Sequence, residues 1–211
     1  MLSFRRIADI AFMLALVAPA LLFSCRSQDG IRFEISFGAG MSAEPLDGRL
    51  LVMISTDGAK EPRFQIVDGP SSQLAFGIDV EGFSAGDAAV IDSSVLGYPL
   101  RSLSEVPPGD YIVQALLHRY ETFQRADGHV VKLPMDRGEG QQWNRAPGNL
   151  YSTPTKIRLE PGADQTVPIE LDLEIPPITE PPDTDYVKHI RLQSELLTEF
   201  WGRPMFLGAL V

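Results

Sequence analysis

The feature that most constrains the fold of this chain is a two-residue alternation of apolar and polar side chains. The run Ile31–Phe37 shows it most clearly, because its odd-numbered residues are all apolar and its even-numbered residues are all polar. This period places the apolar side chains on one face of a β-strand. About eight or nine such runs, with turns roughly every 8–12 residues and almost no helical periodicity, predict an all-β fold.

Two stretches are apolar on both faces and are expected inside a sheet. The turn Pro107–Asp110 introduces Tyr111–Tyr120, where proline presets φ and the following Gly-Asp favours a tight reversal. Arg49–Ser55 has the same two-sided apolar pattern. Strands of this kind are buried on both sides. The polar Gln114 and His118 within the first stretch are expected to pack against the Trp143 loop or another neighbour.

Other segments are expected at the margins of the sheets. Asp127-Gly128 is typical of a hairpin turn, which makes His129–Leu133 the return strand. Pro62–Val67 is predicted to be a short strand with Phe64 and Ile66 facing inward. Thr166–Ile175 alternates strictly but contains Pro168, which lacks an N–H group, so we expect an edge strand there.

These strands predict an immunoglobulin-like or prealbumin-like antiparallel β-sandwich over residues 31–175, with a barrel as the alternative. Residues 176–185 are rich in proline and are expected to form an extended linker. Residues 186–211 are expected to begin a second, truncated domain. Its β candidates are 186–192, 196–201 and 203–211, and the last is expected to have no partner strand in this chain. The alternative is that these strands complete the sandwich.

The N-terminus resembles a bacterial lipoprotein signal. Residues 1–24 combine Arg5 and Arg6 with an apolar stretch that is too short for a comfortable transmembrane helix. The segment Leu22–Cys25 is similar to a lipobox, in which the cysteine thiol receives the lipid. Cys25 is also the only cysteine. We therefore expect lipid attachment at Cys25, a tether over residues 25–30 and a place in the bacterial cell envelope; the alternative is an ordinary signal peptide with an incidental cysteine.

The charge of the chain excludes one class of partner. The net charge is −10 and the sequence contains no cluster of lysine and arginine. An acidic surface of this kind argues against binding to a nucleic-acid backbone. The hydrophobic fraction of 44% is sufficient for a packed core. No motif for a cofactor is present, and we predict none.

One catalytic motif occurs, in a context that does not suit it. Gly82-Phe83-Ser84-Ala85-Gly86 matches the G-x-S-x-G nucleophile elbow. That elbow requires a buried strand before the serine and a helix after it. Asp79 and Glu81 occupy the preceding strand, and the residues that follow are too β-branched for the helix. We interpret Ser84 as a chance match, and we predict no catalytic residue in this chain.

The loop between Gln141 and Tyr151 is the best candidate for a binding or interdomain contact. Amide side chains and an aromatic ring can together hold a glycan or a peptide, and an arginine can hold a carboxylate. The alternative is structural: the tryptophan caps the core and the amides satisfy the loop backbone. The candidate residues are Gln142, Trp143, Asn144, Arg145, Asn149 and Tyr151.

The histidines and the acidic clusters do not have metal-ligand spacing. His118, His129 and His189 each lack a second ligand at a suitable interval. Asp183 and Asp185 form one acidic group, but neither they nor the last alternating strand contains a dense calcium-binding loop. The acids of that strand are Glu170, Asp172 and Glu174. We predict no metal site.

Four segments together resemble a family of larger exported bacterial proteins. They are Glu61–Arg63, Val106–Ala115, Gly140–Ser152 and Leu197–Pro204. In that family an N-terminal β-domain precedes an α/β-hydrolase domain of the esterase D or enterochelin-esterase-like kind. The resemblance covers most of residues 31–211 and implies a serine esterase as the parent protein. It also implies that residues 186–211 correspond to the opening strands of the hydrolase domain, with the catalytic residues outside this chain.

Overall fold

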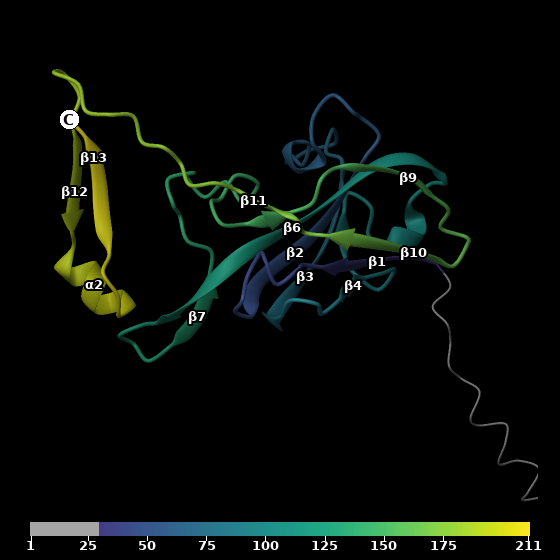
Figure 1. Cartoon of the computed structure of the whole chain (residues 1–211), viewed down its shortest axis with the longest axis horizontal. Coiled ribbons are helices and arrows are strands. Elements are labelled where there is room, and N and C mark those ends of the chain that lie inside the picture. Colours follow the sequence, from purple (N-terminus) through teal and green to yellow (C-terminus); the bar gives the residue numbers. More distant parts are fainter. Residues whose placement is uncertain (1–29) are drawn as a thin grey trace, which may run out of the picture.

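Two β-sheets face each other across one hydrophobic core in the computed structural model, which describes residues 30–211 (Figure 1). The smaller sheet has the order β10-β1-β4. The larger has the order β11-β8-β6-β2-β3-β5. Two further strands, β7 and β9, also pair with β6 along other parts of its length. The predicted all-β, sandwich-like fold is confirmed. The predicted signal segment 1–24, Cys25 and tether residues 26–29 lie outside the described residues.

The smaller sheet is built around β1 (Ile31–Ser36), the strand with the strict alternation. It pairs antiparallel with β4 (Ala89–Ile91) and parallel with β10 (Gln165–Glu170). The parallel pair corrects the expectation of a purely antiparallel sandwich. It is possible because the first and last strands of the smaller sheet are joined through most of the larger sheet, rather than by a hairpin.

The larger sheet is centred on β2 (Leu46–Ser55) and β6 (Gly109–Gln124). These two strands pair with each other, and β2 also pairs with β3 (Leu74–Phe83), so the predicted central strands are confirmed. Short strands complete the sheet: β5 (Gly97–Tyr98), β7 (Val130–Leu133), β8 (Leu150–Tyr151), β9 (Thr155–Leu159) and β11 (Leu173–Glu174). The predicted hairpin over Asp127-Gly128 is confirmed by the β6–β7 pairing.

The core fills the space between the sheets. Phe33 and Ile35 of β1 meet Leu50 and Val52 of β2 there, and all four are fully buried. The opposite face of the larger sheet carries a smaller apolar cluster around Met53, which loops cover. A 3-10 turn, η3 (Leu103–Glu105), precedes β6. The larger sheet is thus buried on both faces, which explains why its central strands are apolar on both faces.

Pro62–Val67 is not the strand predicted. It begins with a 3-10 turn, η2 (Pro62–Phe64), in which the Gln65 N–H donates to the Pro62 carbonyl at 2.9 Å. Proline at the start of the turn supplies the required φ and needs no hydrogen-bond acceptor. Phe64 and Ile66 are half-buried on the outer face of the larger sheet instead of lying in the main core.

The predicted strand Thr166–Ile175 is divided between the two sheets. β10 ends at Glu170, the Leu171 N–H donates to the Ser36 carbonyl, and the chain then crosses to pair as β11 with β8. The crossing exposes Leu173, which was expected to face inward. The edge position predicted from Pro168 is confirmed, because β10 is the outermost strand of the smaller sheet.

The residues after the linker form a separate hairpin with a helical turn. β12 (His189–Gln193) leads into α2 (Glu195–Trp201), and β13 (Phe206–Leu210) returns antiparallel to β12. This corrects two expectations: 196–201 is helical, and the last strand has a partner. Ser194 caps α2 through its hydroxyl group, which is a common start signal for a helix. The β12–β13 pair forms its own sheet and does not complete the sandwich.

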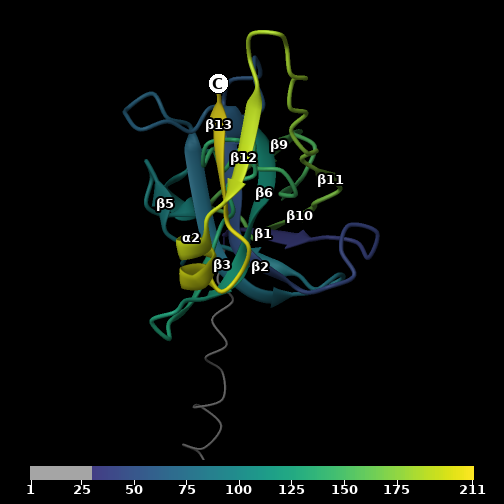
Figure 2. The ribbon, with the colours of Figure 1, turned by 90° about the vertical axis from the view of Figure 1, so that its left-hand side faces the viewer.

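This C-terminal hairpin contacts the sandwich through a projecting arm, made of the end of β6 with β7 (residues 121–133; Figure 2). Arg203 forms an ion pair with Glu121 at 2.6 Å, and the Trp201 ring meets the Phe123 ring edge-on at 5.4 Å. Gly202 is required at this contact. Its φ is +65°, and a Cβ would lie 2.8 Å from the Gln124 carbonyl oxygen.

Within residues 30–211 no helix is long and apolar enough to span a membrane.

Candidate functional site

The predicted site loop lies over the outer face of the larger sheet. The half-buried rings of Trp143 and Tyr151 pack against the small cluster of Met53, Leu116 and Ile175. Leu116 of β6 lies opposite Leu51 of β2 in register, so the cluster occupies the face that points away from the main core. The ring of Trp143 therefore covers apolar surface of the sheet, as the structural interpretation of this loop requires.

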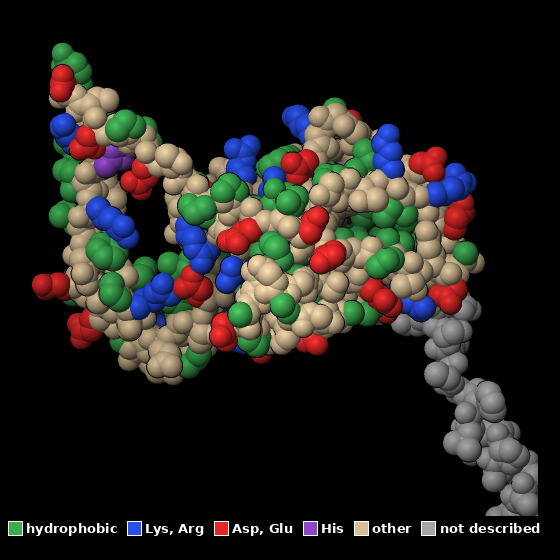
Figure 3. All heavy atoms as spheres, in the orientation of Figure 1, with side chains coloured by type: hydrophobic (Ala, Val, Ile, Leu, Met, Phe, Trp, Pro, Cys, Tyr) green, Lys and Arg blue, Asp and Glu red, His purple; other side chains and the backbone are tan. Residues whose placement is uncertain are grey.

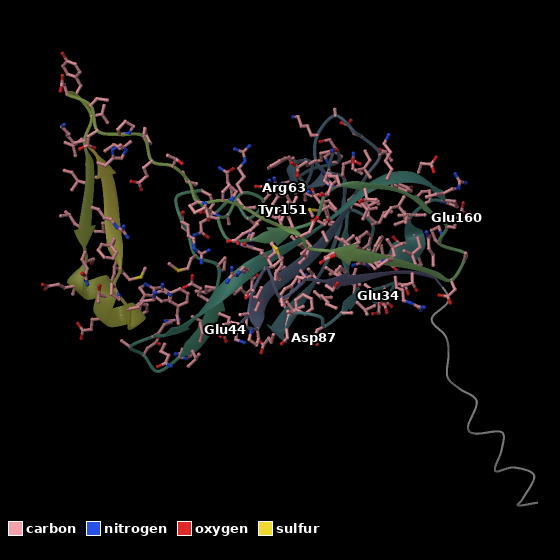
Figure 4. All side chains as sticks on the ribbon, in the orientation of Figure 1. Glu34, Glu44, Arg63, Asp87, Tyr151 and Glu160 are labelled. Carbon is pink, nitrogen blue, oxygen red and sulfur yellow. The ribbon has the colours of Figure 1, made fainter. Side chains whose placement is uncertain are left out.

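Arg63 is the most constrained polar side chain beneath this loop. Its guanidinium lies 4.5 Å from the ring centroid of Phe64 and 4.2 Å from that of Tyr151. Figure 4 shows Arg63 and Tyr151 side by side on this face. Only 8% of the residue is exposed, so the stacking takes place in a largely desolvated setting, where cation–π attraction is strongest.

An acid and an amide complete a polar network around Arg63. Glu61 Oε2 accepts from Arg63 Nε at 2.8 Å and from Gln114 Nε2 at 2.8 Å. Gln114 Oε1 accepts from the Arg63 backbone N–H at 3.1 Å, and Gln114 Nε2 also donates to the Ser152 carbonyl. Gln114 is fully buried. Both donors of Nε2 and the acceptor Oε1 are therefore hydrogen-bonded inside the protein.

The charge state of Glu61 follows from these contacts. Burial on its own raises the pKa of this carboxyl group. The hydrogen bonds from Gln114 and Arg63, together with the positive charge of Arg63, outweigh burial and bring the pKa of Glu61 below its usual value. Glu61 is therefore ionised at neutral pH, and its charge is neutralised by a single partner that is itself held between two rings.

The two asparagines of the loop are also used internally. Asn149 is fully buried; its Oδ1 accepts from the Arg119 N–H and its Nδ2 donates to the Trp143 carbonyl at 2.7 Å. Asn144 exchanges two hydrogen bonds with Arg63, one from Nδ2 to the Arg63 carbonyl and one from Arg63 Nη1 to the Asn144 carbonyl. These contacts fix the loop to the strands and to η2.

The six candidate residues therefore divide into two groups. Trp143, Asn144, Asn149 and Tyr151 contact one another, the strands beneath them or η2, whereas Gln142 and Arg145 are exposed. The Arg145 guanidinium lies 5.4 Å from the Phe64 ring, on the outside of the Arg63 stack. Sequence reasoning missed the acid–amide–arginine network of Glu61, Arg63 and Gln114. Its one visible signal was a glutamine in a strand that is otherwise apolar on both faces.

Hollows in the surface lie elsewhere. One of about 470 Å³ is bordered by Thr56, Tyr111 and Lys156, and one of about 220 Å³ lies between β9 and β10. A third, of about 330 Å³, adjoins the linker at Pro177 and Ile178. The linings of these three hollows do not include Gln142, Trp143 or Arg145.

The G-x-S-x-G stretch does not have the surroundings of a nucleophile elbow. The Ser84 hydroxyl donates to the Gly82 carbonyl at 3.1 Å, and the Ser84 N–H donates to Asp87 Oδ2. A turn and the short strand β4 follow, where an elbow would have a helix. The strand before Ser84 is β3, which leads to the rim of the sandwich.

The three histidines are dispersed. His118 packs edge-on against Tyr120 with ring centroids 5.7 Å apart, and burial is the main cause that lowers its pKa. His129 lies beside Asp127, and His189 Nδ1 lies 3.0 Å from Asp183 Oδ1. Across residues 30–211, no group of three His, Cys, Asp or Glu side chains is arranged to hold a metal ion.

Compared with protein-family models, with curated proteins and with solved structures, the chain shows no significant match.

Proposed function

We propose that this chain is the non-catalytic β-sandwich module of an exported bacterial lipoprotein that works with a serine-esterase-like α/β-hydrolase domain. The sandwich positions that domain or helps it to select substrate. The proposal rests on the sequence resemblance over 31–211 and on the form of the C-terminal hairpin, which is the observation that carries it. In this proposal residues 176–185 are the linker and residues 186–211 belong to the hydrolase side.

The C-terminal hairpin carries large apolar side chains of the kind usually buried in a core, but no other part of residues 30–211 covers most of them. Many of its large apolar side chains are solvent-exposed, among them Leu192 at 62%, Leu207 at 54% and Leu210 at 68%. Figure 3 shows apolar side chains along the hairpin and open space between it and the sandwich. A contiguous apolar surface of this kind marks an interaction site. We therefore infer that another folded unit covers it.

The exposed side chains of the site loop support a second, weaker candidate function. A stand-alone glycan- or peptide-binding lipoprotein would use the Gln141–Tyr151 loop, yet of its six candidate residues only Gln142 and Arg145 are exposed. Trp143 is committed to the outer cluster of the sheet. The loop therefore serves the accessory role better, as a brace between η2 and β6.

The proposed lipid anchor suits this arrangement. The described chain begins at one end of the sandwich and the C-terminal hairpin lies at the other (Figure 1). A lipid at Cys25 would hold the first end at the membrane surface, and the hairpin would then project away from it. A catalytic domain seated on the hairpin would face the surrounding compartment and not the lipid.

A fluorophosphonate experiment tests the hydrolase association. Envelope fractions are labelled with a fluorophosphonate probe, and the protein is recovered with an antibody against the sandwich. We expect a probe-labelled serine hydrolase in the recovered material, either as part of the same polypeptide or as a bound chain. Labelling should be unchanged by Ser84→Ala. Recovery without any labelled hydrolase, or labelling that Ser84→Ala abolishes, contradicts the proposal.

The anchor has its own test. Each methylene of an attached acyl chain contributes about 0.8 kcal/mol of membrane affinity, so two or three chains at Cys25 give firm attachment. We expect Cys25→Ser to move the protein from the membrane fraction to the soluble fraction, with Ser27→Ala as a control that leaves partition unchanged. Membrane partition that survives Cys25→Ser shows that Cys25 carries no anchor.

A further inference from the structure

The two edges of the C-terminal hairpin differ in their hydrogen bonding. Lys188 and Val211 exchange both backbone hydrogen bonds, at 2.7 and 2.9 Å, and the Ser194 N–H donates to the Met205 carbonyl. Because antiparallel pairs alternate, the inward-bonding residues of β13 are 207 and 209, and its outward-pointing residues are 206, 208 and 210. The outward residues of β12 are 189, 191 and 193 by the same alternation.

The outer edge of β12 is partly closed. The outward N–H of His189 donates to Asp183 Oδ1 at 2.9 Å, and the same carboxylate contacts His189 Nδ1 at 3.0 Å. The charge beside this edge is the Asp183 carboxylate itself, because the Arg191 guanidinium reaches across the hairpin to 4.2 Å from the ring centroid of Phe206 in β13. A charged side chain and a capped amide are the devices by which natural proteins protect an edge strand.

The outer edge of β13 has neither device. The segment Phe206–Leu210 contains no charge and no proline, and within residues 30–211 it pairs with β12 alone. Its outward N–H and C=O groups at Phe206, Gly208 and Leu210 therefore face open space. An uncharged edge with regular unpaired backbone groups is a template for strand addition.

The faces of the two strands show the same asymmetry. On one face, Ile190 and Leu192 of β12 lie beside Ala209 and Leu207 of β13, so that face is apolar throughout. On the other face the β12 side chains are polar, at His189, Arg191 and Gln193, while those of β13 are Phe206 and Leu210. Thus β13 is apolar on both faces and β12 on only one. A strand that is apolar on both faces is an interior strand of a sheet that has covering layers on both sides.

We propose that the outer edge of β13 accepts a further β-strand from a domain whose sheet is covered on both faces by helices. The inference rests on the proposed function for the identity of that domain, the hydrolase. A second copy of this chain fits less well. Edge-to-edge pairing of two β13 strands would join the hairpins but would leave both faces of the resulting sheet, including Leu207 and Phe206, exposed to water.

The test uses residues 30–211 and a short synthetic peptide of alternating threonine and valine with lysine at each end. Amide hydrogen exchange is measured with and without the peptide. We expect fast exchange at 206, 208 and 210 in the free protein, and protection of these three amides when the peptide binds. Protection at 189, 191 and 193 instead, or no binding at all, overturns the proposal. Protection without peptide that increases with protein concentration shows that a second copy occupies the edge, and also overturns it.

Two matched substitutions assign the effect to one edge. Gly208→Pro removes an outward N–H from β13, and Arg191→Pro removes one from β12; proline is tolerated at such outward positions. Gly208→Ala keeps the N–H, and its Cβ meets nothing within 4 Å. We expect Gly208→Pro to weaken peptide binding by about tenfold or more, as loss of a hydrogen bond plus steric block requires, and the other two to leave it within about twofold.

Retained protection at the Val211 amide shows that the hairpin is still folded in each variant. Equal weakening by Gly208→Pro and Arg191→Pro contradicts the assignment of the edge. The outcome is separate from that of the fluorophosphonate experiment. Peptide binding at β13 without a labelled hydrolase would refute the proposed function and leave the acceptor edge standing.

Discussion

At the scale of single residues, the polar network around Gln114 is expected to contribute strongly to the stability of the sandwich. Gln114 lies among apolar neighbours on β6, opposite Met53 in register, and satisfies both the Arg63 backbone and the Glu61 carboxylate. A buried group left without its partner loses its full solvation free energy, which exceeds the net gain from an ordinary hydrogen bond. The network therefore confers specificity on this face of the sheet as well as stability.

The first prediction concerns Gln114→Leu. The change keeps a similar volume but removes the partner of the Arg63 N–H and of the Ser152 carbonyl, and it removes one of the two donors to Glu61 Oε2. We expect the free energy of unfolding, measured by urea titration, to fall by about 1–3 kcal/mol. Gln142→Leu is the matched control, because Gln142 is exposed, and its effect should stay within about 0.5 kcal/mol. Equal effects of the two changes would show that the network contributes nothing.

The second prediction is a pH dependence that belongs to Glu61. Its pKa is lower in the folded protein than in the unfolded chain, where the usual value is about 4.3. The unfolded state therefore binds the proton first as the pH falls. The stabilisation by Glu61 is complete above the unfolded pKa and is lost as the pH falls through the folded pKa.

Urea titrations of the wild type and of Glu61→Gln at a series of pH values measure this directly. We expect the wild type to be more stable at pH 7 and the difference to shrink below about pH 4. Because a good part of the Glu61 side chain is exposed, solvent screening keeps the difference modest. A difference that is constant across this range would contradict the lowered pKa.

At the scale of elements, a strand could be predicted where its own side-chain pattern was sufficient, whatever strand it pairs with. β2 and β6 were predictable as central strands because two apolar faces need burial wherever the strand lies. The parallel β1–β10 pairing was not, because periodicity within a strand carries no information about a partner more than a hundred residues away. The Pro62–Phe64 turn is not predictable for a related reason: its buried polar residue is Arg63, whose partners come from β6, β8 and the site loop.

The candidate site shows the same limit. Local composition identified the Gln141–Tyr151 loop as amide-rich and aromatic, and could not tell whether those groups face a ligand or the protein. The answer depended on Arg63 and Arg119, which lie far away in the sequence and supply the partners of Asn144 and Asn149.

The third prediction concerns the contact between the arm and the C-terminal hairpin. Arg203 pairs with Glu121 and also lies over the Phe123 ring, so Arg203→Ser removes two contacts at once. In a Trp143→Phe background, Trp201 is the only tryptophan and reports on the arm. We expect a red-shifted emission, because Trp201 leaves the edge of Phe123 and becomes hydrated.

Arg191→Ser is the control for that experiment. Arg191 contacts Phe206 within the hairpin and not the arm, so its removal should leave the emission unchanged. If Arg203→Ser also leaves the emission unchanged, the remaining contacts hold the hairpin, namely the aromatic pair and the hydrogen bond from the Ala126 N–H to the Phe200 carbonyl, and the ion pair is a surface pair of little value.

At the scale of the whole molecule, the chain consists of a sandwich with a complete core and a hairpin without one. The residues of both hydrophobic clusters come from positions up to 175, whereas no residue of the α2 helix is buried. Two-stranded hairpins are marginally stable in water without a covering layer. We therefore expect the arm to stabilise the hairpin, and we expect the sandwich to fold without the hairpin.

The last prediction follows from that asymmetry. A chain shortened to residues 30–185 loses no core residue of the sandwich. It loses the cover of Phe123, the Arg203–Glu121 ion pair and the hydrogen bond from the Ala126 N–H to the Phe200 carbonyl, all on the arm, and we expect its free energy of unfolding to fall by at most about 2 kcal/mol. A chain shortened to residues 30–164 also loses β10 and β11, with Val167, Leu171 and Ile175 of the core, and should be unfolded. Circular dichroism and urea titration distinguish the two. If 30–185 also fails to fold, the hairpin is an integral part of the sandwich, and its exposed apolar strands then require a structural explanation instead of a partner domain.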